Sequence, residues 1–119
     1  MELSTRNEVH LVGRLSAAAE VRELPSGDEL TTFRLILDRP RDVARARPAA
    51  VVRRAATVDV IDCVAWAPTV QRAAQGWAPG DWLQLDGSLV KRFWRTAAGL
   101  GSRTEVSVAK AKRVARAAA

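Results

Sequence analysis

The chain has 119 residues, which suits one domain and leaves little room for a second. Nineteen Lys and Arg against thirteen Asp and Glu give a formal charge of +6, which favours a polyanionic partner but also fits a merely basic protein. Cys63 is the single cysteine, which excludes a disulfide scaffold. The sequence contains neither a signal-peptide pattern nor the run of about 20 apolar residues that a membrane helix needs. We therefore expect a soluble, cytoplasmic protein without membrane contact.

The first third of the chain alternates between apolar and polar residues, as half-buried strands do. Residues 9–15 form the first such run, and Gly13 within it indicates a bulge or a tight bend of a barrel. Residues 20–24 are a short extended piece that leads into a turn over Pro25, Ser26, Gly27 and Asp28. Residues 30–38 form the next predicted strand.

Periodicity disappears over residues 39–56, where six arginines accompany a single acid, Asp42. Pro40 and Pro48 oppose regular structure there, so we expect a long, mobile, basic loop. Residues 57–66 regain strand character but are apolar on both faces, which is typical of a strand that is covered on both sides. Residues 68–77 then predict a short helix, whose apolar stripe is Val70, Ala73, Ala74 and Trp77.

A pair of strands closes the predicted domain. The first arm spans residues 82–94, with a bulge expected at Gly87, and a glycine-rich tip at 97–102 connects it to a second arm at 103–109. Residues 110–119 hold four basic residues and no acid. We therefore divide the chain into a domain over residues 1–109 and a basic C-terminal tail over 110–119.

The order of these elements predicts the fold. The class is all-β, and one short helix lies between the third and fourth main strands. Five strands with a helix at that place describe a five-stranded OB-fold barrel.

Several short stretches resemble the bacterial single-stranded DNA-binding protein family. They are residues 7–15 (NEVHLVGRL), 20–22 (EVR), 33–35 (FRL), 62–66 (DCVAW), 79–81 (PGD), 86–89 (DGSL) and 104–106 (TEV). The similarity runs from about residue 7 to residue 108, nearly the whole chain. It is based on the order and spacing of these stretches taken together.

The resemblance implies an OB-fold that binds single strands in DNA replication, repair and recombination. It also implies a protein that often assembles as a homotetramer, and we expect it at the nucleoid. Because the strand over residues 57–66 is apolar on both faces, one face should be buried against another subunit, with a homodimer as the minimum unit and a homotetramer as the expected state. Aromatic residues of the family stack on bases at positions that match Trp66 and Trp94, whereas two further stacking positions hold Arg41 and Val60 here. The family's long tail with an acidic tip has no counterpart in this sequence, so we expect a short paralogue or a truncated product, and no recruitment of partners through such a tip.

The candidate DNA-binding residues follow from chemistry as well. Single strands are bound by aromatic platforms for the bases and a positive groove for the backbone. Trp94 shares a strand face with Arg92, opposite Phe93, and a DNA-binding role is favoured over a core position. Trp66 is equally compatible with a subunit interface, and Trp77 is expected in the core. The full set of candidates is Trp94, Trp66, Arg92, Arg34, Arg22, Arg41, Arg53 and Arg54.

No residue pattern indicates catalysis. His10 has no second metal ligand nearby, and Gly99 with Gly101 belongs to a hairpin tip rather than to a nucleotide-binding loop. We expect no enzyme activity, no metal and no cofactor. Two alternatives to DNA binding stay open, which are an RNA-binding OB module and an oligomeric accessory or scaffold protein with weak nucleic-acid binding.

Overall fold

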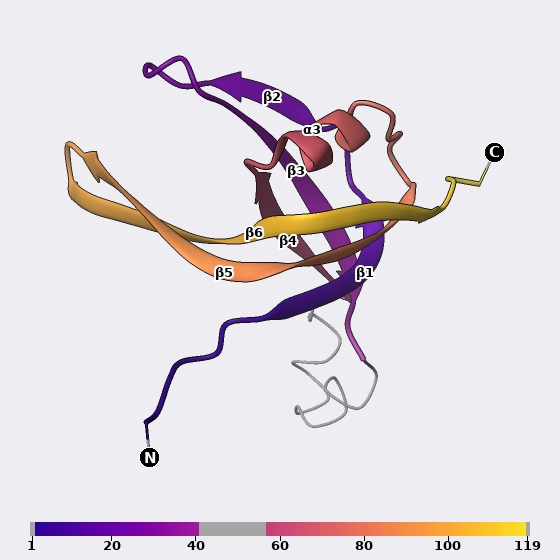
Figure 1. Cartoon of the computed structure of the whole chain (residues 1–119), viewed down its shortest axis with the longest axis horizontal. Coiled ribbons are helices and arrows are strands. Elements are labelled where there is room, and N and C mark those ends of the chain that lie inside the picture. Colours follow the sequence, from indigo (N-terminus) through magenta and orange to yellow (C-terminus); the bar gives the residue numbers. More distant parts are fainter. Residues whose placement is uncertain (1, 41–56, 119) are drawn as a thin grey trace.

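The computed structural model describes residues 2–40 and 57–118 (Figure 1). Residues 41–56, which make up most of the predicted basic loop, lie outside the described residues. They include three of the predicted DNA-binding residues, Arg41, Arg53 and Arg54. The elements in chain order are β1 (Val9–Leu15), β2 (Glu20–Glu23), β3 (Glu29–Asp38), β4 (Val58–Ala65), α3 (Pro68–Ala74), β5 (Trp82–Thr96) and β6 (Gly99–Ala115).

The strands form a closed barrel. Their order is β1-β5-β6-β4-β3-β2, and an additional pairing between β1 and β3 closes the ring. The short β2 extends the sheet at β3, outside the five strands of the barrel. The helix follows β4 and precedes β5. The predicted five-stranded OB-fold barrel with one helix between the third and fourth main strands is confirmed.

Closure of the barrel requires a glycine at position 13. At the end of β1, Arg14 pairs with Trp82 of β5 on one side, and Arg14 and Leu15 pair with Ile36 and Leu35 of β3 on the other. A β-carbon on Gly13 would collide with the backbone carbonyl oxygen of Ile36. The missing side chain therefore allows β1 to cross closely over β3, as the sequence predicts for a tight bend.

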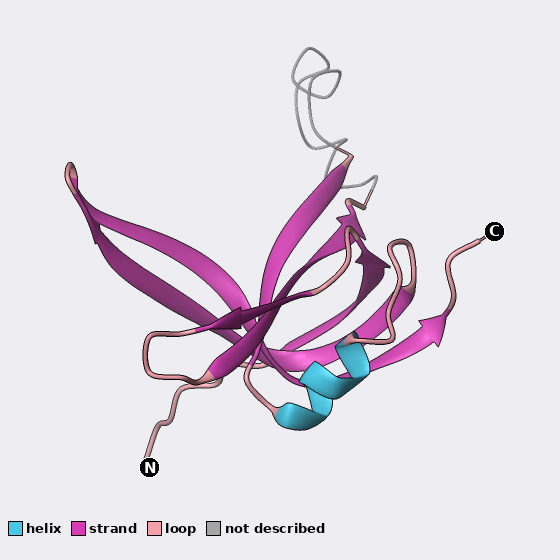
Figure 2. Cartoon of the chain, turned by 90° about the horizontal axis from the view of Figure 1, so that it is seen from above, coloured by secondary structure: helices cyan, strands magenta, loops and turns pink. Residues whose placement is uncertain are grey.

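The core fills the barrel and one of its ends. Its most deeply buried leucines are Leu35 and Leu83, both 0 % exposed. Residues Val70 and Ala74 of α3 are buried against this core, and Figure 2 shows the helix at one end of the barrel. Just after the helix, the ring of Trp77 packs edge-on against Phe33, with 5.3 Å between centroids. Trp77 is a core residue, as predicted.

The β5–β6 hairpin is longer than predicted and projects from the barrel (Figures 1 and 2). Thr96 pairs with Gly99, so the turn consists of two residues rather than the six-residue tip expected from sequence. Strand β6 continues to Ala115, beyond the predicted end at residue 109, because its last residues pair with the first part of β5. A register shift between Asp86 and Gly87 confirms the bulge.

Candidate nucleic-acid interface

An open groove of about 320 Å³ runs between the β2–β3 side of the barrel and the base of the β5–β6 hairpin. Its charged lining residues come from five strands, so the tertiary fold alone brings them together. Four of them are arginines and three are carboxylates. They are Arg22, Arg34, Arg92, Arg103, Glu20, Asp62 and Glu105. We call this the binding groove.

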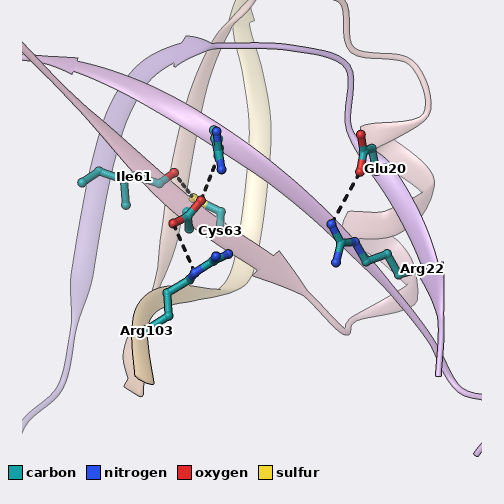
Figure 3. Close-up of polar contacts among 7 residues, drawn as sticks. Glu20, Arg22, Ile61, Cys63 and Arg103 are labelled. Atoms are coloured by element: carbon teal, nitrogen blue, oxygen red, sulfur yellow. Dashed lines mark hydrogen bonds and ion pairs between the residues drawn. The ribbon is translucent and has the colours of Figure 1, made fainter. Parts of the chain in front are cut away.

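Asp62 links two of the arginines. Nε of Arg34 donates to one carboxylate oxygen of Asp62 at 3.0 Å, and Nε of Arg103 lies 3.9 Å from the other. Figure 3 shows the Arg103 side chain reaching from its strand toward this carboxylate. Arg34 lies on β3, opposite Asp62 on β4, and Arg103 lies on β6. One carboxylate thus joins three strands across the floor of the groove.

Glu105 forms the second charged contact of the groove. It is only 5 % exposed, and its carboxylate lies 3.4 Å from Nε of Arg92 on β5. Arg92 is therefore the basic partner of this buried carboxylate, as a buried acidic group requires. Arg34, Arg92 and Arg103 keep about half of their side-chain surface exposed. The groove therefore consists of a layer of exposed guanidinium groups over fixed carboxylates.

Trp94 continues this surface onto the hairpin. Trp94 as a whole residue is 40 % exposed. The guanidinium carbons of Arg92 and Arg103 lie 5.8 and 6.0 Å from its centroid, within range of cation–π attraction. Because these two arginines also line the binding groove, the groove and the indole form one continuous surface. An aromatic platform beside a row of guanidinium groups is the chemistry that single strands require.

Comparison with known proteins agrees with this chemistry. A profile of the Single-strand binding protein family matches residues 6–114. The chain belongs to this family. One similar solved structure is the Plasmodium falciparum SSB complex with ssDNA, with a TM-score of 0.70 and 23 % sequence identity. That match covers 94 % of this chain and 96 % of the other, and at this identity it supports the fold. A comparison with curated proteins finds no match.

Single-strand binding proteins bind single-stranded DNA and catalyse no reaction, as the sequence analysis expects for this chain. Among the described residues, no group of three His, Cys, Asp or Glu could hold a metal ion. In the same part of the chain, no helix is long and apolar enough to cross a membrane.

The structure brings together some of the predicted site residues of this single-strand binding protein. Arg22, Arg34 and Arg92 line the binding groove, and Trp94 adjoins it through Arg92. Trp66 lies directly after β4 and is 49 % exposed, but it does not line the groove. The backbone carbonyl of Trp66 accepts a hydrogen bond from Gln71 of the helix.

Sequence reasoning missed Arg103, Asp62 and Glu105. Arg103 lies opposite Arg92, a pairing that follows from the two-residue turn of the hairpin. With the tip placed at residues 97–102, the register of the two arms was wrong, and Arg103 was not recognised as a neighbour of Arg92. The sequence of β4 could have revealed Asp62, since it is one of only two acids, with Asp59, in a strand that is otherwise apolar.

The carboxylates of the groove also act on the core beneath it. Burial raises the pKa of the Cys63 thiol to about 12, and the negative charges of Asp62 and Glu105 add to this effect. Cys63 is 1 % exposed and its thiol donates to the carbonyl oxygen of Ile61 at 3.6 Å (Figure 3). The only cysteine of the chain is therefore a structural thiol.

Proposed function

We propose that this chain binds single-stranded DNA along the binding groove and across Trp94, without sequence preference. One observation carries the proposal. Arg92 and Arg103 both line the groove, and both also lie beside the indole of Trp94. A strand can then place its phosphates over the guanidinium groups while a base stacks on Trp94. Trp66 and the arginines Arg41, Arg53 and Arg54 extend this interface in the proposal.

A titration with oligo(dT), followed by tryptophan fluorescence at two salt concentrations, tests this function. We expect saturable quenching and an affinity that falls as salt rises, because bound phosphates release counterions. Competition by oligo(rU) of the same length separates DNA from RNA binding, since preferential binding of RNA would select the alternative of an RNA-binding module. Absence of binding to either oligomer at low salt would instead favour the scaffold alternative.

We further propose that the chain acts as a homo-oligomer, a dimer at least and a tetramer as the working state. Strand β1 pairs with β5 along one edge, but its other edge pairs with β3 only at Arg14 and Leu15 within the described residues. Val12 of β1 and Trp82 of β5 lie on the outer face and are 55 % and 38 % exposed. A free strand edge beside exposed apolar side chains suits self-association across a two-fold axis.

Sedimentation velocity at micromolar concentration tests the assembly. A dimer or tetramer mass is expected, and a stable monomer would contradict the proposal. The cellular setting that we propose is DNA replication, repair or recombination, in the cytoplasm at the nucleoid.

A further inference from the structure

Three arginines of the binding groove approach their carboxylates through the same atom, Nε, which forms a hydrogen bond in Arg34 and ion pairs in Arg103 and Arg92. Arg34 donates to Asp62 through Nε, the Nε of Arg103 is the atom nearest to Asp62, and the Nε of Arg92 is the atom nearest to Glu105. A guanidinium group has five N–H donors, four of them on its two terminal nitrogens. Contact at Nε therefore directs the terminal pair away from the carboxylate, and this pair is the fork that binds a phosphate through two hydrogen bonds.

The carboxylates themselves are held rigidly by the sheet. Cys63 of β4 is opposite Val106 of β6, so the preceding residues, Asp62 and Glu105, face the same side of the sheet. The side chain of Glu105 is only 6 % exposed and that of Asp62 is 29 % exposed, whereas the three arginines are 44 to 61 % exposed. The acids therefore lie beneath the arginines and not above them, where they would oppose an approaching phosphate.

We propose that Asp62 and Glu105 are positioning residues of the DNA interface. They hold Arg34, Arg103 and Arg92 by Nε and so present the terminal nitrogens to the phosphates of a single strand. Fixing long side chains in advance reduces the entropy that binding must otherwise remove. The carboxylates stay on their arginines when DNA binds. This inference rests on the proposed function of the groove.

The variant Asp62→Asn separates positioning from simple charge. It keeps the size of the side chain and removes one negative charge from the groove. If Asp62 merely opposed the phosphates, the affinity for oligo(dT) would rise. If it positions Arg34 and Arg103, the affinity falls by about two- to tenfold, the factor that corresponds to the loss of one net hydrogen bond. Glu105→Gln is expected to act in the same direction through Arg92.

Glu20→Gln is the matched control, because Glu20 lines the same groove and the change in charge is identical. Its carboxylate lies 3.8 Å from Nη2 of Arg22, and both of these β2 side chains are well exposed (Figure 3). This variant should bind oligo(dT) more tightly than the wild type, because it removes a negative charge from the groove without releasing an arginine that Asp62 or Glu105 holds. Asp62→Asn should also no longer weaken binding once Arg34 and Arg103 are both replaced by Ala, since there is then nothing for Asp62 to position.

An NMR measurement on the wild type tests the proposal without any variant. The Nε–H signal of Arg34 should be protected from exchange in the free protein and should persist when oligo(dT) is added. Loss of this signal on binding would mean that phosphate replaces the carboxylate, and the proposal would be wrong. It would also be wrong if Asp62→Asn bound as well as the wild type, or lost the same affinity in the double arginine variant. Failure of the wild type to bind any oligonucleotide would instead refute the proposed function.

Discussion

The indole of Trp94 lies across Gly101, the residue opposite it on β6. A β-carbon on Gly101 would be only 2.6 Å from Cε2 and Nε1 of the ring, closer than van der Waals contact allows. The ring can take this position because glycine has no side chain. Gly101 thus determines where the aromatic platform of the hairpin points.

Replacement Gly101→Ala should weaken oligo(dT) binding, because the added methyl group moves the indole while leaving it in the protein. Trp94→Ala sets the upper limit, about 1–3 kcal/mol for the loss of one stacked base. Fluorescence titration measures both variants, and thermal unfolding checks the fold. Ser102→Ala, the neighbouring change on the opposite face of β6, should bind as the wild type does. Unchanged binding by Gly101→Ala would show that the position of the indole over Gly101 does not affect the affinity for oligo(dT).

Stacking and charge should respond differently to salt. Trp94→Ala should leave the slope of log K against log[salt] nearly unchanged, since tryptophan neutralises no phosphate. Arg34→Ala and Arg92→Ala should each reduce the slope by up to about 0.7, the value for one phosphate contact on a single strand. Replacing Arg41, Arg53 and Arg54 together should flatten the slope further while stacking survives. A salt slope that these arginine variants leave unaltered would contradict phosphate binding by the groove.

The pKa of His10 in the folded protein should be higher than the ordinary value for histidine. Its hydrogen bond with Asp86, 2.7 Å between Nδ1 and Oδ1, is the main cause that raises this pKa, and Glu8 adds a smaller effect. The resulting stabilisation is fully present below about pH 6.5, the unfolded value, and is lost as the pH rises through the higher folded value. The chain has one histidine, so a single NMR resonance reports it. Asp86→Asn should lower the pKa more than Glu8→Gln.

Cys63 should be inert in the folded protein. With a pKa of about 12, roughly one thiol in ten thousand is ionised at pH 8, and only the thiolate reacts with alkylating or disulfide reagents. We expect one equivalent of thiol to react in denaturant and almost none in buffer. Rapid reaction of the native chain would mean that β4 opens or that the thiol is not buried.

Asp81 should stabilise the end of the barrel down to acid pH. Its carboxylate accepts the backbone N–H groups of Ala78 and Ala117, at 2.9 and 2.8 Å, and these bonds lower its pKa with help from Arg113. This stabilisation is present above about pH 4, the unfolded value, and is lost as the pH falls through the lower folded value. Asp81→Asn should lower Tm at pH 7, and the difference from wild type should narrow in acid. Asp28→Asn, in an exposed turn, should change Tm little.

Local patterns predicted most of the fold. Alternation between apolar and polar residues placed β1 and β3 to within a residue, because one face of each strand is buried in the barrel, and a run that is apolar on both faces placed β4 to within a residue at each end. The helix was predicted to reach Trp77 but ends at Ala74. The apolar stripe continued to Trp77, and this residue does pack in the core, but through a turn that includes Gly76.

The sequence by itself determined the strand pattern, the place of the helix and the types of residue that a DNA interface needs. Trp94, Arg92 and Arg34 were identified in this way, since each lies on the polar or exposed face of its own strand. Only the tertiary structure decided which residues meet. Arg103 reaches Asp62, and Glu105 lies beneath Arg92, because of the hairpin register and the pairing of β4 with β6. Such contacts depend on the closure of the whole barrel, and no periodicity within one strand encodes them.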